Sequence, residues 1–211
     1  DISSAIPERK EGAGNPVAKI TGELGGRSRA GRSALVARYG GNAASEAAVR
    51  AGLEWLVEHQ SSDGSWSFDH TRAVCAGSCS QPGSLKKSQM GATSMAVLAL
   101  LGAGHTHGQG DYRKQVWSGL NYLLSNAKQT PDGLDLRGAA EGNSGMYIQG
   151  LATITLCEAL AMSEAVLKTR PRGKSRNQEE RVDRKVLVSS RVRLRQGAQL
   201  ALNFIMRAQN T

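Results

Sequence analysis

The stretch WLVEHQSSDGSW, Trp55 to Trp66, joins the end of an amphipathic helix to a tight turn. Apolar residues recur at helical spacing up to Gln60, and the Asp63-Gly64 pair that follows is a strong turn signal. A tryptophan stands two residues after the glycine of this turn. Because the turn reverses the chain, we expect Trp66 to fold back onto Gln60.

The same order of a small residue, an aromatic residue and a glutamine occurs at three places in the chain. The glutamines are 69 and 80 residues apart, which is long enough for two helices and their loops. This spacing favours an array of helical hairpins. The matching residues are Gly52, Trp55, Gln60, Gly64 and Trp66 in the first copy, Gly119, Tyr122, Gln129 and Gly133 in the second, and Ala201, Phe204 and Gln209 in the third.

Ala and Leu at helical spacing dominate the middle of the chain, and no run alternates apolar and polar residues long enough to predict a sheet. We therefore predict an all-α protein. The second and fourth helices are apolar on several sides, which is typical of helices buried among others. No transmembrane helix is expected, since the longest apolar run spans only Met95 to Leu101. The predicted helices cover residues 45–60, 88–102, 112–128 and 145–167, with a fifth from after 189 to 209.

The basic residues lie mostly outside these helices. The formal net charge is +9, concentrated between Gly25 and Gly41 and between Lys168 and Arg195. Neither cluster has interleaved aromatic residues or a nucleic-acid-binding motif, so we expect solvated segments and no specific nucleic-acid partner. The predicted organisation is a flexible Gly-rich basic linker over 1–43 and a helical domain over 44–211 with a charged insertion at 168–190.

The motif that begins at Gly52 and ends at Trp66 resembles the QW motif of the terpenoid cyclase and protein prenyltransferase superfamily. The stretches SWSFDH, MYIQGLATITLCEA and NFIMRAQN are similar to bacterial proteins with prenyltransferase and squalene-oxidase repeats. The resemblance implies a structural motif, in which the glutamine binds backbone groups of a neighbouring helix and the indole covers it. It also implies an α/α toroid of alternating inner and outer helices.

The third copy of the motif stops at Gln209, before its glycine and tryptophan, and a closed ring in this family has about twice as many helices. A partial toroid, self-associating through its open edge, is therefore the expectation. We expect a scaffold, or a module that binds an apolar small molecule, lipid or peptide. The alternative is an isoprenoid-processing enzyme, squalene-cyclase-like or zinc prenyltransferase-like, with catalytic residues beyond Thr211. The cellular compartment is left unassigned, and an exported or membrane-associated bacterial protein is favoured.

No catalytic motif of these families is found in the sequence. Squalene cyclases protonate an alkene with an aspartate of a D-x-D-D motif, which is absent here. The closely spaced Asp132 and Asp135 are expected in a turn after the third helix, where a structural role is favoured over an acid. The C-G-E-Q stretch of thioester domains is also absent. Catalytic residues are therefore left unassigned.

The chain has three cysteines and four histidines, several of them close together. The Cys-x-x-x-Cys pair could form a disulfide loop in an exported protein, remain as two unused thiols, or hold zinc as protein prenyltransferases do. These alternatives stay open, and no cofactor is predicted beyond that zinc possibility. Cys157 is expected in the core. The possible metal ligands are Asp69, His70, Cys75, Cys79, His105 and His107.

Overall fold

The computed structural model describes residues 29–72, 75, 78–80, 83, 85–140, 142–169 and 184–209. The chain divides into two compact units, residues 1–42 and 43–211. The described part of the first unit contains helix α2, Arg29–Arg38, within the segment expected to be a linker. That expectation is wrong for this stretch, because RAGRSALVAR is rich in helix-forming Ala, Leu and Arg. Gly40, with φ +82°, follows the helix in the conformation typical of a helix end.

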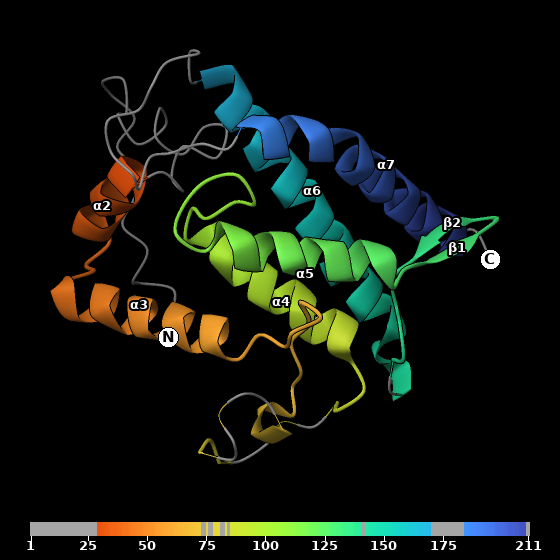
Figure 1. Ribbon diagram of the computed structural model, residues 1–211, viewed down its shortest axis with the longest axis horizontal. Helices are drawn as coiled ribbons and strands as arrows, with labels where there is room; N and C mark the ends of the chain where they lie inside the picture. The colour runs from red at the N-terminus through yellow and green to blue at the C-terminus, as the bar shows by residue number, and fades with distance from the viewer. Residues whose placement is uncertain are drawn as a thin grey trace, which may run out of the picture. The chain divides into compact units, whose positions relative to one another are not determined.

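The second unit is helical, which confirms the predicted all-α class (Figure 1). It starts with α3, continues through the pair α4 and α5, and ends with the two longest helices, α6 and α7. A two-stranded antiparallel hairpin separates α5 from α6. The elements are α3 (Ala43–Glu58), η3 (His70–Arg72), α4 (Gln89–Gly102), α5 (Arg113–Ser125), β1 (Lys128–Thr130), β2 (Gly133–Asp135), η4 (Gly142–Ser144), α6 (Gly145–Thr169) and α7 (Arg184–Ala208).

Two boundaries differ most from the predicted ones. Helix α5 ends at Ser125, three residues before the predicted end, and strand β1 begins at Lys128 and pairs with β2 around Pro131-Asp132. Helix α7 begins at Arg184, inside the expected charged insertion. Its first turns are helical because Leu187 is buried, as are Leu194 and Ala198 further along the same stripe. The rest of that insertion, 170–183, lies outside the described residues.

Helices α4 and α6 form the core of the second unit. The side chain of Ile148 approaches Gly91, and Thr155 Oγ1 donates to the Ser94 carbonyl at 3.3 Å. The later residue of α4 therefore contacts the later residue of α6, so the two helices run parallel. Helix α5 packs on α4, and α7 packs on α6. This places the most apolar helices inside and the amphipathic ones outside.

Helix α6 is long and apolar enough, by length and composition, to cross a membrane over Gly145–Leu167. This differs from the expectation of no such segment. However, α6 packs against both α4 and α7, and it carries the buried polar residues Gln149, Thr153 and Ser163. All three side chains are hydrogen-bonded within the protein. We therefore treat α6 as a central helix of the folded unit.

Candidate functional site

The first copy of the motif forms a clasp between α3 and α5. The Gln60 side-chain amide donates to the carbonyls of Gly64 and Gln115, each at 3.0 Å. Trp66 is only 3% exposed, and its indole N–H donates to the Leu56 carbonyl at 2.7 Å. The tryptophan thus returns to the end of α3, as the turn predicts. Gln60 ties the turn to the first turn of α5, the next outer helix.

The second copy is built differently. Gln129 is exposed on β1, and its amide donates only to the neighbouring Thr130 carbonyl, at 3.3 Å. The fully buried Gln149 of α6 makes the ties instead. Its amide donates to the carbonyls of Leu134 and Ala201, and its oxygen accepts from Leu136 N–H at 2.7 Å. One glutamine therefore joins β2, α6 and α7, but it is not the glutamine of the motif.

The turn glycines of the two copies make equivalent contacts. Gly64, with φ +90°, lies so close to α5 that a Cβ would be 2.5 Å from the Ser118 carbonyl oxygen. Gly133, with φ +134°, lies equally close to α7, where a Cβ would be 2.2 Å from the Leu200 carbonyl oxygen. Ser118 and Leu200 immediately precede the small residue of the next motif copy in each case. The turn of one hairpin therefore packs against the same position of the following outer helix.

The other motif residues occupy varied environments. Gly119 packs directly on Val97 and Trp66, whereas a Cβ at Gly52 would meet nothing within 4 Å. Tyr122 is half-buried on α5, and Phe204 is buried under the Arg137 guanidinium, 5.1 Å from its ring centroid. Gln209 is exposed just after α7.

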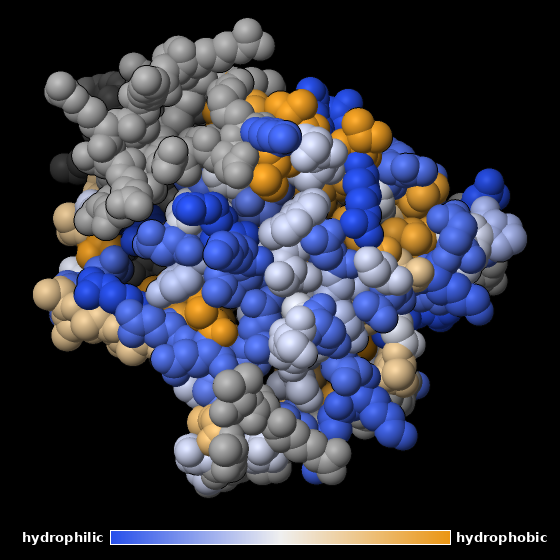
Figure 2. Space-filling view, in the orientation of Figure 1, coloured by the Kyte–Doolittle hydropathy of each residue, from blue (hydrophilic) through white to orange (hydrophobic). Residues whose placement is uncertain are grey.

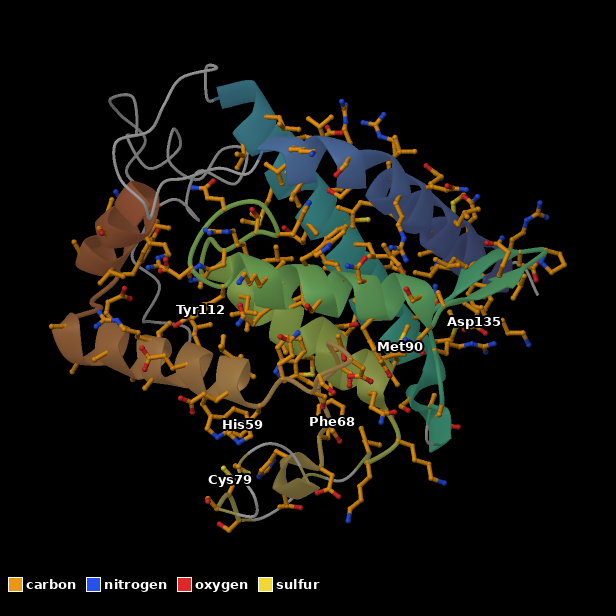
Figure 3. The ribbon with its side chains drawn as sticks, in the orientation of Figure 1. His59, Phe68, Cys79, Met90, Tyr112 and Asp135 are labelled. Carbon is orange, nitrogen blue, oxygen red and sulfur yellow. The ribbon has the colours of Figure 1, made fainter. Side chains whose placement is uncertain are left out.

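His59, Cys75 and Cys79 form a compact group of possible metal ligands beside the clasp. The ligand atoms of the three residues all lie within 4.8 Å of one another, and Cys79 Sγ is 3.3 Å from His59 Nε2. His59 is buried at the end of α3, and Figure 3 shows Cys79 in the loop below it. No disulfide joins the two cysteines. The sequence-based ligand set contained the two cysteines but missed His59.

Trp55 and His70 surround this group. The Trp55 indole stacks on the His59 ring, with centroids 3.9 Å apart, and its N–H points at Cys79 Sγ at 3.4 Å. His70 lies edge-on to Trp55, while its Nε2 is 3.1 Å from the Ser80 carbonyl. Besides its place in the motif, Trp55 therefore contacts His59, His70 and Cys79, the last of which lies with Cys75 in the loop after η3, called the cysteine loop below.

The remaining sequence-based ligands are not part of the group. Asp69 is buried, accepts from the Thr71 hydroxyl and lies 3.7 Å from Lys86 Nζ. His105, in the loop after α4, contacts the Tyr112 ring, with the two rings tilted and their centroids 4.7 Å apart. His107, in the same loop, is buried against α7. Of the six possible ligands, the structure brings Cys75 and Cys79 together, and the other four have separate partners.

His107 forms a buried polar contact with α7. Its Nε2 lies 2.8 Å from Ser190 Oγ, which itself donates to the Val186 carbonyl at 2.7 Å. The imidazole therefore donates to the hydroxyl, and its buried Nδ1 has no hydrogen-bond partner within the part of the chain that the structure describes. Burial lowers the pKa of His107 from 6.5 to about 4, because a charged ring would be desolvated. The histidine is neutral at physiological pH.

Asp135, one of the two aspartates of the hairpin, is unsuited to acid catalysis. Asp135 is held by the Arg137 guanidinium, with its Oδ2 2.9 Å from Nη2. The hydrogen bonds from Arg137 lower the pKa of Asp135, which opposes proton donation. Asp132 lies in the turn between the strands, as expected, and is exposed. Cys157 is half-buried in α6, and its burial raises the pKa of its thiol.

Apolar side chains remain exposed on α4 and α6. Met95 is 48% exposed and Ile154 is 52% exposed, and each adjoins a partner of the Ser94–Thr155 hydrogen bond. Tyr147, near the start of α6, is 68% exposed. By contrast, Figure 2 shows mostly hydrophilic groups over α5, with apolar groups gathering where α7 lies. The core helices thus present an apolar face of their own, defined by Met95, Tyr147 and Ile154.

Comparison of the chain with protein-family models, curated proteins and solved structures gave no match.

Proposed function

We propose that residues 43–209 form a helical-hairpin repeat scaffold, arranged as part of an α/α toroid of the terpenoid cyclase type, that binds an apolar ligand on its inner helices. The support for the repeat is the equivalent packing of the Gly64 and Gly133 turns on the following outer helices. The parallel course of α4 and α6 is also the arrangement that alternating inner and outer helices require.

The observation that carries the ligand-binding function is the exposure of Met95 and Ile154 on neighbouring helices whose other faces are packed. Exposed apolar patches rimmed by polar groups commonly mark binding surfaces. Met95 and Ile154 expose aliphatic side chains, so the face suits an isoprenoid or acyl chain. A role as scaffold is favoured over an enzyme because Asp135, one of the two aspartates weighed as an acid, is paired with Arg137.

The test is binding of 1-anilinonaphthalene-8-sulfonate, followed by displacement with farnesol as a simple isoprenoid. The unmodified chain should enhance the dye fluorescence, and farnesol should reverse the enhancement. Because both positions are exposed, the double variant Met95→Glu, Ile154→Glu should lose this signal without a lower melting temperature.

A matched control is Val49→Glu on α3, where the side chain is 52% exposed on a different helix. This variant should retain dye binding. Equal binding by the double variant and the unmodified chain would refute the proposed face. Dye binding that farnesol leaves unchanged would refute the isoprenoid class of ligand.

A further inference from the structure

We propose that His59, Cys75 and Cys79 bind one zinc ion that fastens the cysteine loop to the end of α3, with the fourth coordination position filled from solution. This site is independent of the proposed apolar-ligand function, since it consists of different residues, at the C-terminal end of α3. It also differs from the Asp, Cys and His set that the sequence suggested.

The spacing of the ligand atoms fits zinc. A tetrahedral site with Zn–S near 2.3 Å and Zn–N near 2.0 Å places its ligand atoms about 3.5 to 3.8 Å apart. Here Cys79 Sγ and His59 Nε2 are 3.3 Å apart, and all three ligand atoms lie within 4.8 Å of one another. Small side-chain rotations would therefore bring the three atoms into coordination. Two thiolates and an imidazole are also the donors that zinc prefers.

The hydrogen bond at the other ring nitrogen prepares His59 for metal binding. Its Nδ1 lies 2.6 Å from the Trp55 carbonyl oxygen. A carbonyl can only accept, so Nδ1 carries the proton of the neutral ring and the lone pair is on Nε2. That lone pair faces Cys79 Sγ. Zinc-bound histidines typically donate their second ring N–H to a carbonyl or carboxylate in this way.

Trp55 supports the same site from a second side. Its indole covers the His59 ring and its N–H donates to Cys79 Sγ at 3.4 Å. A donor to a ligand sulfur favours the thiolate form that zinc requires. His70 lies outside the set, because its ring nitrogens are not among the ligand atoms that lie within 4.8 Å of one another, and its Nε2 is bonded to the Ser80 carbonyl. Within the described residues the ligand set is therefore three, which leaves one tetrahedral position for water or another small ligand.

A zinc ion here would strengthen a weakly packed region. Leu53 is the only buried apolar residue of α3, and the end of α3 is otherwise held by the Gln60 and Trp66 hydrogen bonds. Because His59 directly precedes Gln60, the metal would fix the loop and the clasp together.

The experiment uses the full chain, purified in a reducing buffer with added zinc, then desalted and analysed for metal content. We expect about one zinc per chain. The single variants His59→Gln, Cys75→Ser and Cys79→Ser should each abolish stoichiometric binding. The controls are His70→Gln, which alters a neighbouring imidazole outside the set, and Cys157→Ser, which removes the thiol in α6. Both should retain one zinc.

Two further measurements do not depend on how the ligand variants fold. Cobalt substitution of the unmodified chain should give the visible bands of a tetrahedral site and a thiolate charge-transfer band. Trp55→Phe, which keeps an aromatic ring but loses the N–H donor, should bind zinc about 10-fold more weakly. Absence of zinc from the unmodified chain would overturn the proposal, as would retention of zinc by both His59→Gln and Cys79→Ser. A single free thiol in the denatured, non-reduced chain would overturn it too, because Cys75 and Cys79 would then be a disulfide.

Discussion

Replacement of Gln149 by methionine tests which glutamine holds the second hairpin in place. Methionine has nearly the same length and volume, so the change removes hydrogen bonds with little change in packing. The buried Leu136 N–H would lose its acceptor, at a cost of about 1–3 kcal/mol, and the Leu134 carbonyl would lose a donor, at about 1 kcal/mol. The Ala201 carbonyl lies within α7 and keeps its helical partner, so its loss adds little.

We therefore expect Gln149→Met to lower the free energy of unfolding by about 3 kcal/mol. For a unit of this size, that corresponds to a fall in melting temperature of about 6–12 °C. Urea unfolding followed by circular dichroism measures the first quantity, and a thermal scan measures the second. The matched control is Gln129→Met, the glutamine of the motif, which is exposed and should change stability by less than about 0.5 kcal/mol. A larger loss for Gln129→Met than for Gln149→Met would refute the reasoning.

Three other predictions follow from the packing and from the buried histidine. Gly119→Ala should lower the free energy of unfolding by about 2 kcal/mol or more, because its Cβ would be 2.5 Å from a Val97 methyl. Gly52→Ala, at the same motif position but in open space, should stabilise α3 by up to about 1 kcal/mol. Urea unfolding measures both changes. Similar effects of the two changes would contradict this. Trp66→Ala should cost about 3–5 kcal/mol, measured in the same way; an unchanged melting temperature would show that the indole is not packed. Because the pKa of His107 is about 4 when folded and 6.5 when unfolded, the unfolded chain binds more protons between these values, so stability should fall by up to about 3 kcal/mol as the pH drops from 6.5 to 4. His107→Gln should remove this part of the pH dependence, and an unchanged profile would rule out His107 as its source.

The sequence predicted the helical class and the first clasp because both depend on local patterns. The run of small and apolar residues in α4 and α6 indicated buried helices, and both helices are central. Gln60 and Trp66 are separated by one tight turn, so their proximity follows from the turn itself. These features required no knowledge of distant contacts.

The second clasp could not be predicted from spacing. Gln60 follows Trp55 by five residues, but Gln129 follows Tyr122 by seven. Gln129 therefore lies within strand β1 instead of just past a helix end, and its side chain is exposed. The glutamine that replaces it is 20 residues further on, within α6, and meets its partners only when α7 has packed. The spacing of residues in a motif does not contain that long-range arrangement.

His59 was missed for a related reason. The candidate ligands from the sequence all lie in the loops that contain Cys75 and His105, whereas His59 directly follows the last residue of α3. The available signal was its position beside the clasp glutamine, since the turn that brings Trp66 back also brings the following loop toward the end of α3. Its contact with Cys79 then depends on how that loop closes.

The equal packing of the Gly64 and Gly133 turns has a consequence for how such a chain can change in length. Ser118 follows Gly64 by 54 residues, while Leu200 follows Gly133 by 67, yet the same glycine-to-carbonyl contact forms in both hairpins. Closing the longer loop costs only about 0.2 kcal/mol more conformational entropy than closing the shorter one. A longer connection between α6 and α7 should therefore have little effect on stability. A side chain at the turn glycine, by contrast, would clash with the carbonyl of the following outer helix. Insertions in this protein, natural or engineered, should be tolerated between one hairpin and the next and rejected at the turn within a hairpin.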